Sequence, residues 1–303
     1  MTETISEKIS ISDIRDDNTF RISRPVVSDA LSRSIKDLGM IEKPYLLDDG
    51  KGLLPVTCHN RIFALRKLEV DRVDSFILKK IEPGVFINNA AMKVRRNEVG
   101  PAGKCRALVI ARKFNLYADT GEFCRRVLNV SPDILNPEFA VRILDLPEGV
   151  KNYIDIKDTG FKIIKDLTAL PQYMIDWIDC SLNLVQVRVN VFKMVVDHLF
   201  DLGKKNPHVV LPVMDPAMAD DRHLIDAVSR LRFPEYSQIK DRADCLISAV
   251  SSRGVSVEFP EFFESARFTV NVDVSVKDSA DVIRARFDGI DAGKLAELAS
   301  ILK

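Results

Sequence analysis

The stretch LPVTCHNRIFALRKL, Leu54 to Leu68, joins a short apolar run to a helical pattern, with a cysteine, a histidine, an asparagine and an arginine at the junction. Ile62, Leu65 and Leu68 recur at the spacing of one helix face, so a strand is predicted to end and a helix to begin here. Free backbone N–H groups and the positive end of the helix dipole meet at such a point and favour a bound anion. The stretch therefore predicts a strand-to-helix turn that can hold a phosphate group.

The side chains at this junction allow two kinds of chemistry. A thiol at a helix N-terminus tends to have a lowered pKa, so Cys58 could be a nucleophile with His59 as its base. Adjacent residues rarely point the same way, however, and free cysteines are usually packing residues. Arg61 is the other candidate, because a planar guanidinium matches two phosphate oxygens at once, although it could equally be a surface arginine.

The segments before and after the junction complete an α/β pattern. A half-buried strand is predicted at residues 9–15, where apolar and polar residues alternate, and a helix follows that stops at Gly39. Residues 44–57 contain two apolar runs around Asp49-Gly50 and Gly52, which predicts a hairpin, and residues 73–78 return to strand character.

Composition narrows the possible classes of protein. The chain has 303 residues, 46% of them hydrophobic, which is enough for two or three domains with their own cores. Its 44 basic residues equal its 44 acidic ones, so the net charge gives no argument about nucleic acid. The sequence lacks a long apolar span and begins with a polar segment, so we expect a cytoplasmic protein without a membrane partner. The cysteines are scattered and never form a CxxC pair, which predicts reduced thiols and no metal site.

The order of these pieces resembles the ParB and sulfiredoxin superfamily. The segments that carry the resemblance are ISISDIR, LSRSIKDLGMIEKPYLL, LLPVTCHNRIFALRKL and MKVRRNEVGPAGKCRALVIARKF, followed by ILDLPEGVKNYI and DLTALP, and they span residues 9 to 171. The resemblance implies an α/β ParB/sulfiredoxin-like N-terminal domain at residues 1–100. It also implies an all-α central domain with a degenerate helix-turn-helix at residues 101–205.

Two sequence boxes of the family match the region around the junction. Gly39 and Pro44 match the first box, and Arg61 matches the last arginine of the second. Cys58, His59 and Asn60 stand where ParB proteins have Gly, Glu and Arg. In a sulfiredoxin alignment anchored on Arg61, the catalytic cysteine would fall at His59 rather than Cys58, which favours the phosphate interpretation.

The third sequence box of the family concerns nucleotide hydrolysis. Arg96 matches its terminal arginine, but Met92 and Lys93 replace the Glu and Asn that the family uses for magnesium and nucleotide hydrolysis. A thioether and an ammonium cannot coordinate magnesium, so efficient CTP hydrolysis is not expected even if CTP or ATP binds. The nucleotide-binding residues implied in this way are Gly39, Pro44, Cys58, His59, Asn60, Arg61, Arg95 and Arg96.

The region after the third box is rich in positive charge. Seven Lys and Arg residues between Lys93 and Lys113 are accompanied by one acid, Glu98, so this surface could hold DNA or simply be solvated. The predicted DNA-binding residues are Lys104, Arg106, Arg112, Lys113, Arg125 and Arg126.

A helix-turn-helix is suggested by Asn129-Val130-Ser131, which resembles the turn of that motif. The recognition helix should follow Ser131, but Pro137 removes a backbone donor and would break that helix. Asn136-Pro137-Glu138 is instead typical of the cap of a new helix. We therefore expect a degenerate motif.

The C-terminal residues 206–303 are predicted to form a small α+β domain. Alternation in RFTVNVDVSV places Phe268, Val270, Val272, Val274 and Val276 on one face of a strand. So small a sheet leaves an open edge that a second copy could pair with, which predicts a homodimer.

The sequence as a whole predicts a ParB-like, DNA-associated, partition- or regulator-like protein. An enzyme that uses the same pocket for nucleotide-dependent phosphotransfer is the alternative.

Overall fold

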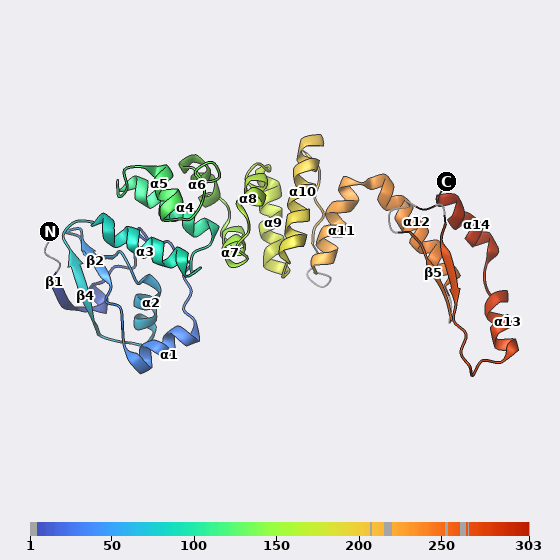
Figure 1. The fold of residues 1–303 in the computed structure, drawn as a ribbon, viewed down its shortest axis with the longest axis horizontal. Coiled ribbons are helices and arrows are strands. Elements are labelled where there is room, and N and C mark those ends of the chain that lie inside the picture. Colours follow the sequence, from blue (N-terminus) through green and yellow to red (C-terminus); the bar gives the residue numbers. More distant parts are fainter. Residues whose placement is uncertain are drawn as a thin grey trace. The chain divides into compact units, whose positions relative to one another are not determined.

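The computed structural model describes residues 5–206, 208–214, 220–251, 254–260, 265 and 267–302. The chain forms two compact units, Met1–Leu224 and Ile225–Lys303, which are coloured from blue to orange and from orange to red in Figure 1. A division of the first unit at residue 100 stays a prediction. No helix in the described part of the chain is both long and apolar enough to span a membrane.

A mixed four-stranded sheet opens the first unit. Its strands are β1 (Ile5–Ser10), β4 (Arg72–Leu78), β2 (Tyr45–Asp48) and β3 (Leu53–Pro55), in that order across the sheet. β4 runs antiparallel to β1 and parallel to β2, and β2 and β3 form the predicted hairpin. Gly50 and Gly52 in its turn have φ values of 78° and 141°, which glycine adopts without strain.

One face of this sheet is covered by the 3-10 turn η1 (Ile11–Asp13) and by helices α1 (Asp29–Leu38) and α2 (His59–Lys67). The core between them consists of Ile11, Ile14, Ile35, Leu46, Ile62, Ala64, Leu65, Val73 and Ile77. Ser28 accepts a hydrogen bond from Leu31 N and caps α1, and Gly39 ends that helix with a φ of 70°, as its sequence predicts. The strand β3 therefore leads into α2 through the turn at Cys58.

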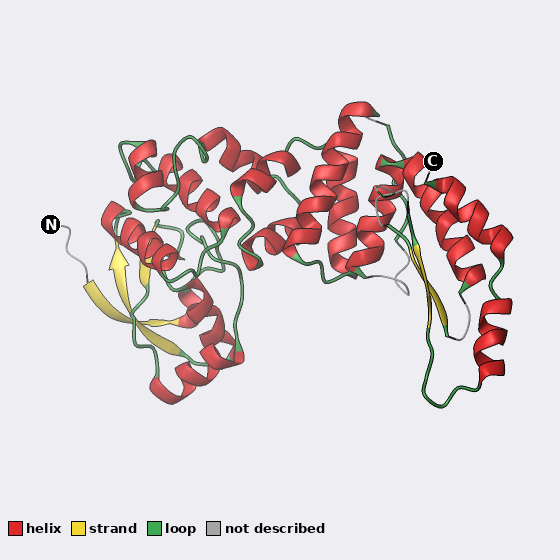
Figure 2. Cartoon of the chain, turned by 45° about the vertical axis from the view of Figure 1, so that its right-hand side comes forward, coloured by secondary structure: helices red, strands yellow, loops and turns green. Residues whose placement is uncertain are grey.

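Helices form the rest of the first unit, as the red elements in Figure 2 show. They are α3 (Pro83–Arg95), α4 (Pro101–Lys113), α5 (Thr120–Arg126), α6 (Pro137–Leu144), α7 (Glu148–Ile156), α8 (Phe161–Leu167), α9 (Gln172–Leu184) and α10 (Val189–Lys205). The predicted new helix at Pro137 is confirmed, because the Asn136 side chain accepts from Phe139 N at the start of α6. Residues 131–135 make one turn closed by hydrogen bonds to Ser131 O. The helix-turn-helix itself stays a prediction.

Helix α11 (Asp221–Arg232) crosses the boundary at Leu224. The second unit continues with α12 (Pro234–Val250), β5 (Val255–Glu258), β6 (Thr269–Val272), α13 (Ala280–Asp288) and α14 (Ala292–Ile301). β5 and β6 form a two-stranded antiparallel sheet in which Val255 faces Val272.

The predicted apolar strand face is too long. β6 ends at Val272, and Val274 and Val276 are exposed, the latter fully. The strand ends because Asp278 closes a turn: its carboxylate accepts from Ser275 N, and its own N–H donates to Ser275 O. Dimerisation through this unit stays a prediction.

Candidate anion-binding site

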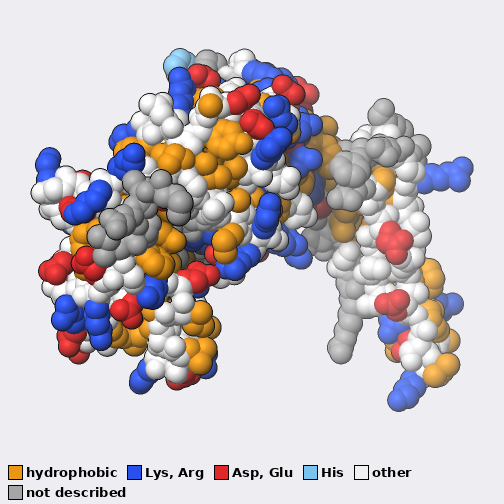
Figure 3. Space-filling view, turned by 60° about the vertical axis from the view of Figure 1, so that its left-hand side comes forward, with side chains coloured by type: hydrophobic (Ala, Val, Ile, Leu, Met, Phe, Trp, Pro, Cys, Tyr) orange, Lys and Arg blue, Asp and Glu red, His pale blue; other side chains and the backbone are white. Residues whose placement is uncertain are grey.

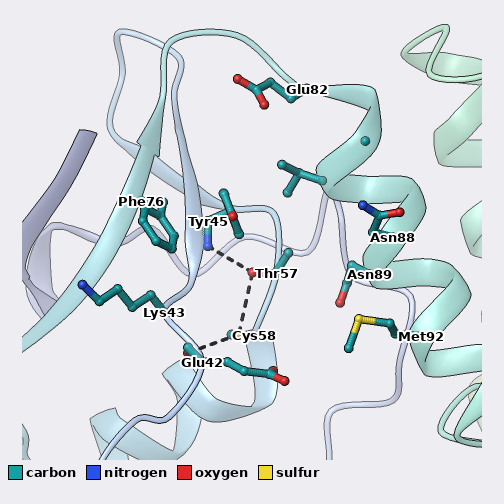
Figure 4. Close-up of a pocket in the computed structure, with 12 residues that line it drawn as sticks. Glu42, Lys43, Tyr45, Thr57, Cys58, Phe76, Glu82, Asn88, Asn89 and Met92 are labelled. Carbon is teal, nitrogen blue, oxygen red and sulfur yellow. Dashed lines mark hydrogen bonds between the residues drawn. The ribbon is translucent and has the colours of Figure 1, made fainter. Parts of the chain in front are cut away.

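Two cavities lie between the N-terminus of α2, the loop before β2, and helix α3. The larger has a volume of about 580 Å³ and the smaller about 250 Å³. Both are lined by Glu42, Cys58, Asn89 and Met92, so they adjoin each other. The larger is drawn in Figure 4.

The larger cavity combines an aromatic wall with an amide wall. The Tyr45 and Phe76 rings stack with centroids 4.9 Å apart and planes 30° from parallel, and the Lys43 ammonium lies 5.6 Å from the Phe76 centroid. Opposite them, α3 presents Asn88, Asn89 and Met92 (Figure 4), and Val85 also lines the cavity. Aromatic faces with amide donors and acceptors suit a planar polar ring.

The N-terminus of α2 opens toward these cavities. Cys58 is the N-cap residue, has a φ of 60°, and makes no side-chain capping hydrogen bond. The first turn of α2 contains no acidic residue. The N–H groups at the start of a helix have no partners within the helix, so this end keeps its preference for an anion.

The smaller cavity is lined by three cations, Arg61, Lys93 and Arg96, and by the acids Glu42 and Glu98. The Arg61 guanidinium donates to Glu42 Oε2 at 2.5 Å, and Arg96 Nη1 lies 4.0 Å from Glu42 Oε1. The Lys93 ammonium donates to the hydroxyl of Ser23 at 3.0 Å, and burial lowers the pKa of Lys93. Cations therefore outnumber acids in this lining, and the Glu42 carboxylate faces two of the three cations, Arg61 and Arg96.

Cys58 and His59 point into different spaces. The Cys58 thiol lines the two joined cavities, whereas His59 lines a small separate cavity with Arg21 and Asp17. Burial raises the pKa of the Cys58 thiol, and burial together with Arg21 and Lys93 lowers the pKa of His59 to about 3. The thiol and the imidazole are thus neutral at pH 7 and are not positioned as nucleophile and base.

The predicted nucleotide-binding residues are only partly brought together. Cys58, Asn60, Arg61 and Arg96 line the smaller cavity. Gly39 and Pro44 instead frame the loop that carries Glu42, with Pro44 buried and its carbonyl accepting from Phe76 N. Arg95 is exposed at the end of α3. Six residues that line the larger cavity were not predicted from the sequence: Glu42, Lys43, Tyr45, Phe76, Asn88 and Asn89. The adjacent amides Asn88 and Asn89 on one helical turn were the sequence feature that could have indicated this cavity.

The predicted DNA-binding residues also differ in their surroundings. Arg112, Lys113, Arg125 and Arg126 are exposed on α4 and α5, while Lys104 is partly buried. Arg112 lies 3.7 Å from Glu138, and Arg126 pairs with Glu122 at 2.9 Å. Arg106 is turned inward to Asp155 at 2.9 Å, so its guanidinium is not on the open surface that the sequence predicted. On the face in Figure 3, Lys and Arg side chains are interspersed with acidic ones.

Comparisons with protein-family models and with curated proteins give no match. Among solved structures, the C-terminally truncated chromosome-partitioning protein ParB from Caulobacter crescentus complexed with CTP-gamma-S is 16% identical, covering 57% of this chain and 98% of that chain, with a TM-score of 0.26. The Pnob8-like ParB-N domain is 13% identical, covering 80% of this chain and 99% of that chain, with a TM-score of 0.38. The same Caulobacter crescentus protein complexed to the centromeric parS site is 15% identical, covering 63% and 97%, with a TM-score of 0.27.

The solved structures to which this chain is similar are thus ParB structures. The resemblance predicted from the order of the sequence boxes is confirmed to the extent that these similar structures are ParB proteins.

Proposed function

We propose that this chain is a ParB-like, DNA-associated protein that binds a nucleotide, CTP or ATP, in the two joined cavities. The observation that carries the proposal is the uncapped N-terminus of α2 with Arg61 beside it. Such a helix end binds phosphate through its N–H groups and dipole, and a guanidinium adds two charge-assisted hydrogen bonds.

The two cavities match the two parts of a nucleotide. The phosphates would lie in the smaller cavity near Arg61, Lys93 and Arg96, and the base in the larger one between Tyr45 and the amides of α3. The cavities adjoin through their shared lining residues, so one ligand can extend from one into the other. Together they suit a ligand that combines a polyanion with a planar ring.

We propose that nucleotide hydrolysis is inefficient. Met92 presents a thioether to both cavities, and the Lys93 ammonium is directed to Ser23. Neither group coordinates magnesium, which prefers oxygen ligands. Steady CTP or ATP turnover that stops when magnesium is chelated would contradict this part and favour the phosphotransferase alternative.

The association with DNA is proposed through exposed basic residues of α4 and α5. Arg112, Lys113, Arg125 and Arg126 can reach phosphates, and Lys104 lies on the same helix as the first two. Arg106 is left out because Asp155 holds it. The Caulobacter crescentus ParB was solved with CTP-gamma-S and with parS, and both ligand classes are proposed here for this chain. A homodimer through residues 206–303 completes the proposal.

An equilibrium-binding panel of CTP, ATP and GTP, with and without duplex DNA, tests this function. We expect saturable binding of CTP or ATP, and DNA binding that weakens as salt is added. A matched pair of variants, Arg61→Ala and Arg95→Ala, separates the cavity from general surface charge, since Arg95 is outside both cavities. Absence of nucleotide binding at millimolar concentration would contradict the proposal.

A further inference from the structure

The cations of the smaller cavity already face an internal carboxylate. Glu42 lies in the loop between α1 and β2. Its carboxylate accepts a 2.5 Å hydrogen bond from Arg61, and Arg96 lies 4.0 Å from its other oxygen. The carboxylate thus makes one charge-assisted hydrogen bond to Arg61 and a longer ion pair with Arg96, and a phosphate group would be drawn to the same two guanidinium groups. Glu42 therefore stands where an anionic ligand group would bind.

The ion pair between Glu42 and Arg61 is partly exposed to solvent. The side chain of Glu42 is 47% exposed and that of Arg61 31% exposed, so water can reach both partners. Exposed ion pairs are weak because solvent screens them and side-chain entropy opposes them. The backbone carbonyl of Glu42 lies 3.9 Å from the Cys58 thiol, which keeps the loop beside the N-terminus of α2.

Lys93 differs from the two arginines. Its ammonium donates a hydrogen bond to the neutral hydroxyl of Ser23, and Glu98 lines the same cavity. Lys93 thus adds to the lining of this cavity a positive charge that is hydrogen-bonded to a hydroxyl and not to Glu42.

We propose that Glu42 is an internal competitor for the anion site, and that a ligand binds by displacing its carboxylate from Arg61 and Arg96. This inference rests on the proposed function as a phosphate-binding site and adds a specificity-determining residue to it. A small monoanion gains too little to replace Glu42. A polyphosphate brings more charge, and a nucleotide adds contacts in the larger cavity, so the competitor selects for these ligands.

Titration calorimetry with inorganic tripolyphosphate and with CTP tests the competitor role. The variants are Glu42→Gln, which keeps the shape but removes the charge, and Glu98→Gln, which makes the same charge change in the same cavity without touching Arg61. We expect Glu42→Gln to bind tripolyphosphate about three- to fivefold more tightly than the unmodified chain, as loss of an exposed ion pair allows, and Glu98→Gln to change affinity less. Unfolding midpoints of all three proteins confirm that each is folded.

The outcomes separate the competitor from the proposed function. Equal gains in both variants would show general electrostatics and overturn the competitor role, as would no gain in Glu42→Gln. If CTP does not bind but Glu42→Gln still tightens tripolyphosphate binding, the competitor stands and the nucleotide assignment fails. If neither ligand binds any of the proteins, both are overturned.

Discussion

The N-termini of α4 and α2, both in the first unit, differ in whether a carboxylate accepts hydrogen bonds from their first N–H groups. At α4, the Asp155 carboxylate accepts from Ala102 N at 2.7 Å and from Gly103 N at 3.3 Å, and it also pairs with Arg106. At α2, the capping residue Cys58 makes no such bond and the first turn has no acid.

At α4 the fold supplies its own anion, whereas at α2 it does not. Gly100 allows α7 to approach α4, since a Cβ at this position would lie 2.6 Å from the Cα of Asp155. The α4 end is thereby filled and becomes part of the packing. The α2 end opens to a cavity. There the carboxylate of Glu42, on an exposed loop, pairs with the guanidinium of Arg61 rather than with the helix N–H groups. We infer that the carboxylate at the N-terminus of α4 stabilises the fold, whereas the N-terminus of α2 can exchange one anion for another.

The largest effect is expected when the anion of α4 is removed. Asp155→Ala deletes a side chain that is 3% exposed, leaves two N–H groups without an acceptor and leaves Arg106 without its carboxylate. We expect the free energy of unfolding to fall by about 3 kcal/mol, the range for a broken buried ion pair. Urea unfolding measures it. A loss below about 1 kcal/mol would show that α4 does not depend on its internal anion.

The next effect is a loss of stability in acid caused by His59 at the start of α2. Burial and the nearby Arg21 and Lys93 lower its folded-state pKa to about 3 from an ordinary value of 6.5. The unfolded chain therefore binds more protons between these values, and stability falls as pH drops below 6.5. Between pH 7 and pH 5 the loss should reach up to about 2 kcal/mol, at 1.36 kcal/mol per pKa unit.

A His59→Gln variant supplies the control for this pH dependence. Since glutamine does not titrate, the variant should lose less stability over the same pH interval, whatever its stability at pH 7. Parallel pH profiles of the two proteins would refute a His59 that stays neutral in the folded protein.

Arg61→Ala should weaken nucleotide binding by about 1.5–3 kcal/mol, because a charge-assisted hydrogen bond to phosphate is lost at the open helix end. Arg95→Ala removes the same charge from an exposed position on α3 and should change binding little. Titration calorimetry compares them. Equal losses in both variants would assign binding to surface charge instead of to α2.

The smallest effect concerns the thiol at the open end. Burial raises the pKa of Cys58, so alkylation at pH 8 should be slower there than at the exposed Cys180 and Cys245. Mass spectrometry of partly alkylated protein measures the order of reaction. Fastest labelling at Cys58 would restore the nucleophile hypothesis for this junction.

Local pattern predicted much of the fold. The strand at β4, the helix stop at Gly39, the hairpin at Gly50 and Gly52 and the new helix at Pro137 each depend on residues close in sequence, and each is found. The strand after Thr269 was predicted too long because alternation continues past the turn that Asp278 closes. The end of this strand is set by the Asp278 side chain, which lies beyond the alternating residues.

Fewer residues of the candidate site could be predicted from the sequence. Arg61 and the helix start could be chosen locally, and the resemblance to ParB added Arg96. Glu42, Tyr45 and the amides of α3 meet only when the sheet and α3 pack together, so no spacing in the sequence shows their cavity. Arg106 was expected on the surface because its partner, Asp155, lies 49 residues later in the chain.

Backbone amide chemical shifts during a CTP titration test the contrast between the helix ends most directly. The N–H signals of His59, Asn60 and Arg61 should move in a saturable way, because the phosphate binds where these groups are free. The signals of Ala102 and Gly103 should stay in place, since Asp155 already fills that end. Shifts at the start of α4 without shifts at the start of α2, or saturable binding that moves neither, would contradict the assignment of the anion site to α2.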